Sequence, residues 1–316
     1  MPLLEVKNLT ISFNGKNAVN DLSIDINKNE IIGLVGESGC GKSLTALSIL
    51  GITPPESKLS GEIIYDGKNL LNLDYEEKRK IRGNKISFIP QDPLSALNPV
   101  FTIGDQISEV LEVHKGISSA EAHLISAKYL ETVNISNPLQ KLKDYPHQFS
   151  GGMRQRVLIA MALVNEPEIL IADEPTTALD VTIQLQILEI MKNLKSKGKS
   201  VLLITHDLAV VSELCDRVYV MYLGKIVESA TTKEIFSNPK HPYTIGLLNS
   251  LPDEKRKSLI PIQGQPPSID SIPSGCAFHP RCNFVFDRCR QEVPGLYDVE
   301  LNKEHKSRCF LEVTDA

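Results

Sequence analysis

The sequence predicts an α/β fold with a layered core, an antiparallel β subdomain near its start, an inserted helical subdomain and an irregular C-terminal extension. Three patterns predict this fold. Residues 31–35 form a short apolar run, which a glycine-rich stretch separates from helix-forming residues 42–50. Two further apolar runs, 169–172 and 201–204, have the length of buried strands. Residues from about 92 to 165 show helical patterns, and these form the inserted subdomain.

The remaining elements follow in chain order. Further strand-like segments are 3–13, 22–26, 61–65 and 85–89. Within the helical subdomain, residues 103–114 have apolar side chains at helical spacing, and Ser118 to Glu121 forms a capping box that opens a second helix. Strand and helix patterns then alternate to about Leu251. We expect one domain over residues 1–250 and a separate extension over 251–316.

The glycine-rich stretch from Gly36 to Ser43 fits G-x-x-x-x-G-K-[ST], a phosphate-binding loop between a strand and a helix. Its backbone N–H groups would wrap the β-phosphate of a nucleotide, and Lys42 would reach the β and γ oxygens. Ser43 would ligate Mg²⁺. The expected nucleotide contacts are Gly36, Ser38, Gly39, Cys40, Gly41, Lys42, Ser43, Leu44 and Thr45. The motif by itself predicts that a nucleotide phosphate is bound.

A pair of carboxylates follows the apolar run 169–172. Asp173 is expected to hold Mg²⁺ through its water shell, and Glu174 to act on the attacking water as general base. Pro175 ends the strand. An Asp-Glu turn with solvated carboxylates is the alternative, but it fits poorly after a strictly apolar run.

A second helix N-terminus that favours anions, besides the one after the phosphate-binding loop, is predicted at Ser150. Ser150 is expected to cap the helix that follows Gly151 and Gly152. The order of these motifs, with Thr205-His206-Asp207 last, resembles an ATP-binding-cassette (ABC) ATPase. The resemblance implies a P-loop NTPase core of the RecA-like kind, with ATP as its ligand. The resemblance implies that Gln91 senses Mg²⁺ and water, that His206 contacts the γ-phosphate, and that Phe13 stacks on adenine. It also implies a head-to-tail dimer with two ATPs, in which Ser150-Gly151-Gly152 of one subunit faces Lys42 of the other. The segment from Thr177 to Asp180 resembles the loop that crosses that interface.

The region after Leu251 is rich in proline and then in cysteine. Pro252, Pro261, Pro266, Pro267 and Pro273 predict an extended connector. Beyond it lie four of the six cysteines of the chain, Cys276, Cys282, Cys289 and Cys309. Their spacing leaves an iron–sulfur cluster, a structural zinc ion and free thiols as alternatives, while a reducing compartment disfavours disulfides. Cys40 lies near a helix N-terminus, where a thiolate is favoured and oxidative inhibition is conceivable, but a small residue that merely fits the loop is the preferred interpretation.

The tail sharpens the resemblance. The segments His241-Pro242-Tyr243-Thr244, Gly264-Gln265-Pro266-Pro267 and Gly275 to Cys282 are similar to the tail of dipeptide and oligopeptide importer ATPase subunits. That resemblance implies a 4Fe-4S cluster on the four tail cysteines, structural or redox-regulatory. It also implies a second, paralogous ATPase subunit, two membrane permease subunits that dock near Leu94 to Phe101, and an indirect link to an extracytoplasmic peptide-binding protein. Nickel and oligosaccharide importers have similar tails and remain alternatives for the cargo.

Composition bounds the other possibilities. The net charge is −5, and the basic run Lys255-Arg256-Lys257 reads as a solvated loop, so no nucleic acid is expected as a partner. A soluble cassette acting on nucleic acid or ribosomes would show tandem cassettes or a long coiled-coil insertion, and this sequence has neither. No apolar run approaches the length of a spanning helix, and residues 1–5 do not read as an export signal. We expect a peripheral protein on the cytoplasmic face of the cell membrane.

Overall fold

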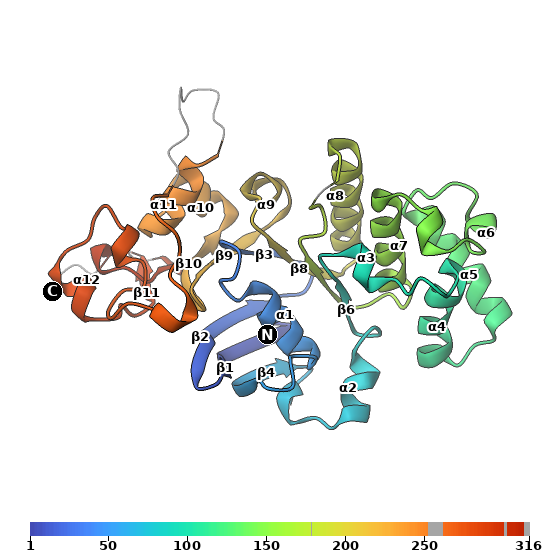
Figure 1. The fold of residues 1–316 in the computed structure, drawn as a ribbon, viewed down its shortest axis with the longest axis horizontal. Helices are drawn as coiled ribbons and strands as arrows, with labels where there is room; N and C mark the ends of the chain where they lie inside the picture. The colour runs from blue at the N-terminus through green and yellow to red at the C-terminus, as the bar shows by residue number, and fades with distance from the viewer. Residues whose placement is uncertain (178, 252–261, 300–301, 313–316) are drawn as a thin grey trace. The chain divides into compact units, whose positions relative to one another are not determined.

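The computed structural model describes residues 1–177, 179–251, 262–299 and 302–312 (Figure 1). The chain forms two compact units. The first comprises Met1–Asn27, Ile31–Leu71 and Ile204–Ala316, and the second comprises Lys28–Glu30 and Asn72–Leu203. The division into a domain to residue 250 and an extension from 251 remains a prediction.

The first unit contains the predicted antiparallel sheet. Its strands are β1 (Leu4–Phe13), β2 (Lys16–Ile26), β4 (Lys58–Tyr65) and β5 (Lys68–Asn69), in the order β2-β1-β4-β5. Asn14 and Gly15 both have positive φ, 50° and 79°, so the β1–β2 hairpin closes through a two-residue turn. Alternate side chains are buried on either side of an irregularity in β1, with Leu4 and Val6 before it and Leu9 and Ile11 after it. This sheet brings Phe13 to the end of β1.

A parallel strand and a helix frame the predicted phosphate-binding loop. Strand β3 (Ile31–Val35) pairs in parallel with β9 (Arg217–Tyr222) and is buried throughout. Helix α1 (Lys42–Leu50) begins directly after the loop and ends at Gly51, whose φ of 65° suits glycine. The predicted strand, loop and helix are all confirmed at these positions.

Further elements of this unit follow β8 (Ser200–Thr205), whose last two residues belong to it. They are α9 (Leu208–Leu214), β10 (Lys225–Thr231), which pairs antiparallel with β9, α10 (Thr232–Ser237) and α11 (Pro242–Asn249). Cys215, which follows α9, is buried beside Gly33 of β3.

The C-terminal extension is more regular than the sequence predicts. It contains α12 (Asp287–Gln291) and the strands β11 (Tyr297–Val299) and β12 (Asn302–Ser307). Strand β12 pairs antiparallel with both β11 and β10, so the strand order here is β11-β12-β10-β9-β3. The prediction of an irregular tail was wrong at this point, because the segment 302–307 is polar and carries no alternating apolar pattern.

The proline-rich connector is described only in part. Pro266, Pro267 and Pro273 lie outside regular helices and strands, as predicted. Pro252, Pro261 and the basic run 255–257 lie outside the described residues.

The second unit combines a parallel sheet with the predicted helical subdomain. Strands β6 (Ile86–Ile89) and β7 (Ile169–Asp173) pair in parallel, and the local order is β8-β7-β6. Helix α2 (Tyr75–Ile81) precedes β6, and α8 (Val181–Ser196) follows β7. Between β6 and β7 lie only helices: α3 (Pro93–Ala96), α4 (Ile103–Lys115), α5 (Ser119–Thr132), α6 (Pro138–Lys141) and α7 (Gly151–Leu163). They form the group coloured green in Figure 1.

The helical subdomain has its own apolar core. Buried side chains from α4, α5 and α7, among them Ile107, Leu111 and Leu130, pack in its interior. Ser118 caps α5 by accepting the N–H of Glu121 at 3.4 Å. None of the helices in the described part of the chain combines the length and the apolar character that a membrane span requires.

Candidate nucleotide-binding site

The phosphate-binding loop runs from Gly36 to Ser43 and depends on its glycines. Gly41 has a φ of 108°, and a Cβ there would lie 2.7 Å from Cε of Met221. A Cβ on Gly36 would lie 2.2 Å from the carbonyl oxygen of Met221. Glycine is therefore required at both positions, because side chains would clash with β9 and one of them would also be strained.

Lys42 lies at the centre of this loop. Its side chain is 5% exposed, and Nζ donates to the carbonyl oxygens of Gly36 at 2.7 Å and Glu37 at 3.0 Å. Thr45 Oγ1 donates to the Gly41 carbonyl at 2.9 Å, while Ser43 is exposed in the first turn of α1. The loop thus curls around one ammonium group beside a helix N-terminus, the arrangement that binds phosphate.

Cys40 does not behave as its position in the loop suggests. The side chain is 4% exposed, and burial raises the pKa of its thiol, with the neighbouring Lys42 opposing the effect. Burial outweighs the nearby cation, so a thiolate is disfavoured here. Cys40 is a small residue that fits the loop.

The structure brings Gln91 and Glu174 together in the second unit. Strand β7 ends at Asp173, which is 4% exposed, and Glu174 follows with a φ of 45°. Gln91 Nε2 and Thr177 Oγ1 each donate to Oε2 of Glu174 at 3.0 Å. Two donors therefore hold a carboxylate whose backbone lies in the left-handed region, which is strained for a residue other than glycine.

The contact from Thr177 was not anticipated. The sequence places Thr177 only in a loop that resembles an interface segment, and no spacing rule links a threonine to a carboxylate three residues earlier. The signal that could have found it is the turn after Pro175, where the Thr177 N–H donates to the Glu174 carbonyl at 3.2 Å. That turn folds the hydroxyl back onto the carboxylate.

The Ser-Gly-Gly segment opens α7 as predicted. Ser150 caps the helix by accepting the N–H of Met153 at 3.3 Å, and both Ser150 and Gly151 are exposed. Asp180 caps α8 by accepting the N–H of Ile183 at 2.9 Å. Between them, Ala178 lies outside the described residues. The N-terminus of α7 is therefore open to an anion from solvent.

Phe13 and His206 lie in the first unit with the phosphate-binding loop. Phe13 is half-buried and pairs with Lys16 across the hairpin, so it is not a core residue. His206 is exposed directly after β8, where the chain turns into α9. Both side chains are thus accessible to a ligand.

Comparisons with known proteins agree with this site. A family model for the ABC transporter matches residues 19–177, and one for the oligopeptide/dipeptide transporter C-terminal region matches residues 227–289. The dipeptide transport ATP-binding protein DppD of Bacillus subtilis is 50% identical over 98% of this chain and 95% of its own. The oligopeptide transport ATP-binding protein OppD of Haemophilus influenzae is 46% identical over 98% of this chain and 97% of its own.

The chain belongs to the oligopeptide/dipeptide group of ABC transporter ATP-binding proteins. A solved dimeric ATP-binding cassette, MJ0796 in a post-hydrolysis state bound to ADP and Pi, is 30% identical with a TM-score of 0.66, covering 72% of this chain and 98% of that chain. The predicted P-loop NTPase fold and ABC-type ATPase activity are confirmed.

The two family matches divide the predicted residues of this ABC ATPase. The first covers the phosphate-binding loop, Gln91, the Ser-Gly-Gly segment and the Asp173-Glu174 pair. The second covers the tail as far as Cys289. Phe13, His206 and Cys309 lie outside both matched segments. Their assignments rest on the order of the motifs along the chain and on the geometry described above.

The four tail cysteines of the ABC subunit lie near one another. Cys289 and Cys309 are buried, and Cys276 and Cys282 are partly exposed; all are free thiols. Burial raises the pKa of Cys309 to about 12, and Cys276, Cys282 and Cys289 each add to that rise. Cys276 interacts in the same way with Cys282 and Cys289, and Cys282 with Cys289. Every pair among the four is therefore within electrostatic range.

A preformed metal site is nevertheless absent from the described residues. Among them, no group of three or more histidine, cysteine, aspartate or glutamate side chains could hold a metal ion. A tetrahedral zinc site with Zn–S bonds of about 2.3 Å needs sulfur atoms about 3.8 Å apart. The described residues therefore give no support to a preformed zinc site or to a preformed cluster site. The comparisons do not support the 4Fe-4S assignment either, so the metal site expected from the sequence is not established.

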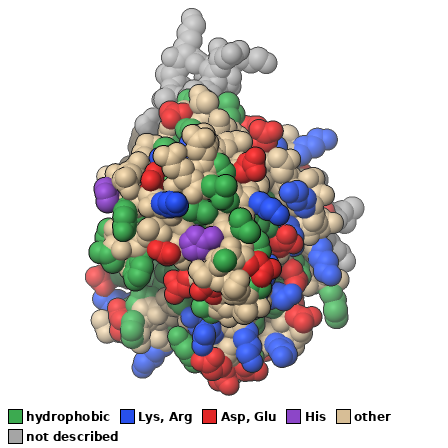
Figure 2. Space-filling model, turned by 90° about the vertical axis from the view of Figure 1, so that its right-hand side faces the viewer, with side chains coloured by type: hydrophobic (Ala, Val, Ile, Leu, Met, Phe, Trp, Pro, Cys, Tyr) green, Lys and Arg blue, Asp and Glu red, His purple; other side chains and the backbone are tan. Residues whose placement is uncertain are grey.

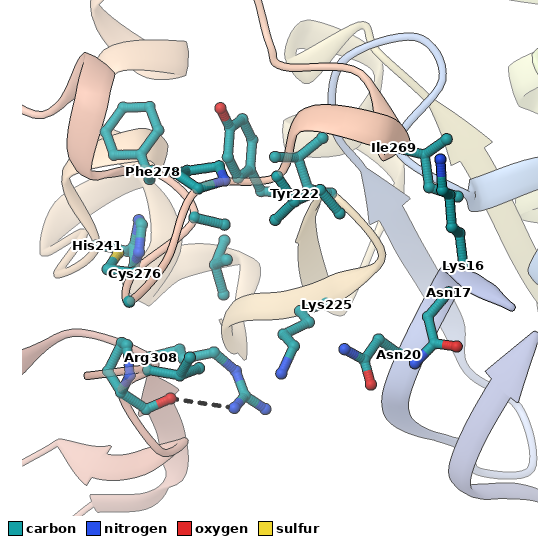
Figure 3. A pocket seen from close by; sticks show the side chains of 18 of the residues that line it. Lys16, Asn17, Asn20, Tyr222, Lys225, His241, Ile269, Cys276, Phe278 and Arg308 are labelled. Atoms are coloured by element: carbon teal, nitrogen blue, oxygen red, sulfur yellow. Dashed lines mark hydrogen bonds between the residues drawn. The ribbon is translucent and has the colours of Figure 1, made fainter. Parts of the chain in front are cut away.

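A cavity of about 300 Å³ lies where the tail meets β2, β9 and β10 (Figure 3). Lys225 and Arg308 line it. Burial lowers the pKa of both side chains, and repulsion from Arg308 lowers that of Lys225 further. Lys16, also in its wall, pairs with Asp270. No described residue of the phosphate-binding loop lines this cavity, so it is separate from the nucleotide site.

Proposed function

We propose that this chain is the ATP-hydrolysing subunit of an importer of dipeptides or oligopeptides. The observation that carries the hydrolytic role is the carboxylate of Glu174, held by Gln91 and Thr177 directly after the strand that ends in Asp173. A fixed carboxylate beside a bound nucleotide is suited to accept a proton from water. Peptide cargo is supported by the names of the relatives, which are dipeptide and oligopeptide transport proteins.

Each residue of the site has a proposed role. Lys42 and the loop N–H groups bind the β- and γ-phosphates, and Phe13 stacks on adenine. The hydroxyl of Ser43 and the carboxylate of Asp173 are hard oxygen donors, the kind that Mg²⁺ prefers. Mg²⁺, when bound, neutralises charge on the phosphate oxygens. Glu174 accepts the proton of the attacking water, Gln91 orients that water, and His206 contacts the γ-phosphate.

We propose that the working unit is a head-to-tail dimer with two ATPs. The exposed N-terminus of α7, with Ser150, Gly151 and Gly152, offers N–H groups to a γ-phosphate held by the loop of the other subunit. The solved cassette with the same fold is described as dimeric. Met153 departs from the glutamine common in the family, but the backbone N–H groups of Gly151 and Gly152 bind the phosphate whatever that side chain is. A paralogous ATPase subunit is the proposed partner.

The face for the permeases is proposed at the segment between β6 and α4. Leu94, Val100 and Phe101 are 67%, 72% and 52% exposed. Figure 2 shows one face of the molecule, on which hydrophobic side chains lie among acidic and basic ones. Exposed apolar residues in a polar surround favour a protein partner. Two membrane permease subunits would dock here, which places the chain on the cytoplasmic face of the membrane, with a peptide-binding protein acting indirectly.

The proposal is tested in the assembled transporter reconstituted in liposomes. Glu174→Gln is expected to lower peptide-stimulated ATP hydrolysis by about 10²–10⁴-fold and to retain ATP binding, because it removes a general base and not a binding group. Glu109→Gln, an exposed glutamate of α4, is the matched control. Unchanged hydrolysis by Glu174→Gln would refute the role of Glu174. Uptake of nickel chelates or oligosaccharides, and not of peptides, would refute the cargo.

We further propose that the four tail thiols take up a 4Fe-4S cluster. The proposal is supported by the mutual proximity of the four thiols, since a cluster binds each thiolate to its own iron. Anaerobically purified protein is expected to contain near-stoichiometric iron and acid-labile sulfide, lost in Cys289→Ser and kept in Cys215→Ser. Zinc, or no metal, in the wild-type protein would overturn this assignment.

A further inference from the structure

The C-terminal tail makes a direct contact with the phosphate-binding loop. Arg281, which immediately precedes Cys282, donates from Nη1 and Nη2 to the two carboxylate oxygens of Glu37 at 2.7 and 2.9 Å. Glu37 is the second residue of the loop. The Arg281 side chain is only 5% exposed and that of Glu37 is 27% exposed. A bidentate pair this far from solvent is both directional and strong.

Arg281 is held in place independently of Glu37. Its Nε donates to the Gln263 carbonyl at 3.0 Å, and Nη2 donates to the Gly264 carbonyl at 3.2 Å. Its guanidinium also lies 5.8 Å from the ring centre of Tyr222 and 5.9 Å from that of Phe278. Tyr222 and Phe278 pack edge-to-face at 5.3 Å and line the cavity of Figure 3. The guanidinium is therefore preorganised by the tail and β9 before it meets the loop.

Glu37 passes this contact on to the nucleotide-binding atoms. Its carbonyl oxygen accepts from Lys42 Nζ at 3.0 Å, and its N–H donates to the hydroxyl of Tyr243 at 2.9 Å. Tyr243 is buried in α11, with its ring 5.4 Å from that of Phe278. Carboxylate, carbonyl and N–H of one loop residue are thus all engaged. Two of these three contacts come from groups that pack on Phe278 of the tail.

The tail also forms a wall beside the loop. A second cavity, of about 390 Å³, is lined on one side by Ser38 and Gly39 of the loop. Pro266, Pro267 and Ile269 of the tail line it on another side. The tail is therefore next to the phosphate-binding loop at two separate places, Arg281 and this wall. A tail that only stabilised its own fold, away from the nucleotide site, would require neither contact.

We propose that Arg281 is a positioning residue for the phosphate-binding loop, through which the tail raises the affinity of the site for MgATP. Without the contact, the loop becomes ordered only when the nucleotide binds. The free-energy cost of that ordering lowers the affinity of the site for MgATP. The inference rests on the proposed ATPase function. Because coupling is reciprocal, bound MgATP also stabilises the seating of the segment around Cys276 and Cys282.

The test compares Glu37→Gln, Arg281→Lys and their double variant in the full-length protein. Glu37→Gln leaves every other contact of Arg281 in place, so the tail keeps its fold. A fluorescent ATP analogue with Mg²⁺ reports the Kd, and steady-state hydrolysis by the assembled transporter reports KM and kcat. We expect each single variant to raise Kd and KM for ATP about five- to tenfold with kcat within about twofold. The double variant should be no weaker than the weaker single one.

Arg290→Lys is the matched control, because Arg290 is an exposed arginine of the same tail and is expected to keep the wild-type Kd. Wild-type Kd in both Glu37→Gln and Arg281→Lys would overturn the proposal. A fall in thermal stability without any change in Kd would also overturn it, since it would leave Arg281 a purely structural residue. Wild-type protein that binds no nucleotide would instead refute the proposed function, so the two failures are distinct.

Discussion

Replacing Thr177 by valine tests how the structure holds the proposed general base. Valine has nearly the shape of threonine, so the change removes one hydroxyl and leaves no cavity. In the structure that hydroxyl and Gln91 share a single carboxylate oxygen of Glu174, each at 3.0 Å. The variant keeps Gln91 as the remaining donor, and Glu174 gains freedom to turn away from the attacking water.

The magnitude follows from the type of bond lost. A hydrogen bond to a charged group contributes about 1.5–3 kcal/mol. This site is exposed to solvent, so the lower end applies. About 1.4 kcal/mol on the transition state corresponds to a tenfold fall in kcat. The KM for ATP should not change, because Thr177 contacts the carboxylate of the general base and is not among the groups assigned to nucleotide binding.

The assay is steady-state ATP hydrolysis by the assembled transporter, with Thr177→Ser as the matched control that restores the hydroxyl. A double variant tests this reasoning. In a Glu174→Gln background, Thr177→Val should lower kcat almost no further, because the carboxylate that Thr177 positions is gone. An equal tenfold loss in that background would show that Thr177 acts elsewhere. A wild-type kcat for Thr177→Val alone would also refute the argument.

Two further predictions address binding and stability. Phe13→Ala should raise the KM for ATP at little cost to kcat, because base stacking is worth about 1–3 kcal/mol and does not touch the reacting atoms; a lost kcat at saturating ATP would exclude this role, and Phe13→Tyr is the control. Burial lowers the pKa of His241 to about 4, opposed by the charge of Glu228 and by a backbone hydrogen bond with Arg308. Because the unfolded chain then binds the proton more readily, the free energy of unfolding should fall by about 3 kcal/mol as pH drops from 6.5 to 4. His241→Asn, which keeps a helix cap at α11, should flatten that dependence in denaturant titrations at both pH values, and an unchanged slope would contradict the assignment.

Local patterns predicted the elements that position the site. The apolar runs at 31–35, 169–172 and 201–204 each became a buried strand, because uninterrupted apolar segments of that length have no solvated face. Gly51 ended α1 and Ser150 capped α7, since both effects depend on neighbouring backbone alone. The same local logic could not give the state of the Cys40 thiol, because that state depends on burial, which is a property of the tertiary structure.

The tail shows where such reasoning stops. Strand β12 reads as a polar, solvated segment, yet His305 within it lies 2.8 Å from the fully buried Glu228 of β10. Lys240 and His241 also donate their N–H groups to that carboxylate, at 2.7 and 2.9 Å. A buried carboxylate contacted from two separate segments, residues 240–241 and β12, selects the strand pairing, and no period in residues 302–307 encodes it.

By itself, the sequence determined the family, the phosphate-binding loop, the carboxylate pair and the Ser-Gly-Gly helix end. Those features are short, contiguous and set by backbone geometry. Only the tertiary structure decided that Thr177 and Gln91 meet on one oxygen of Glu174, that the four tail thiols lie together, and that Arg281 contacts Glu37. The last pair is separated by 244 residues, and contacts at that distance depend on how strands β9 and β10 carry the tail back to the loop, a result of packing that no local pattern contains.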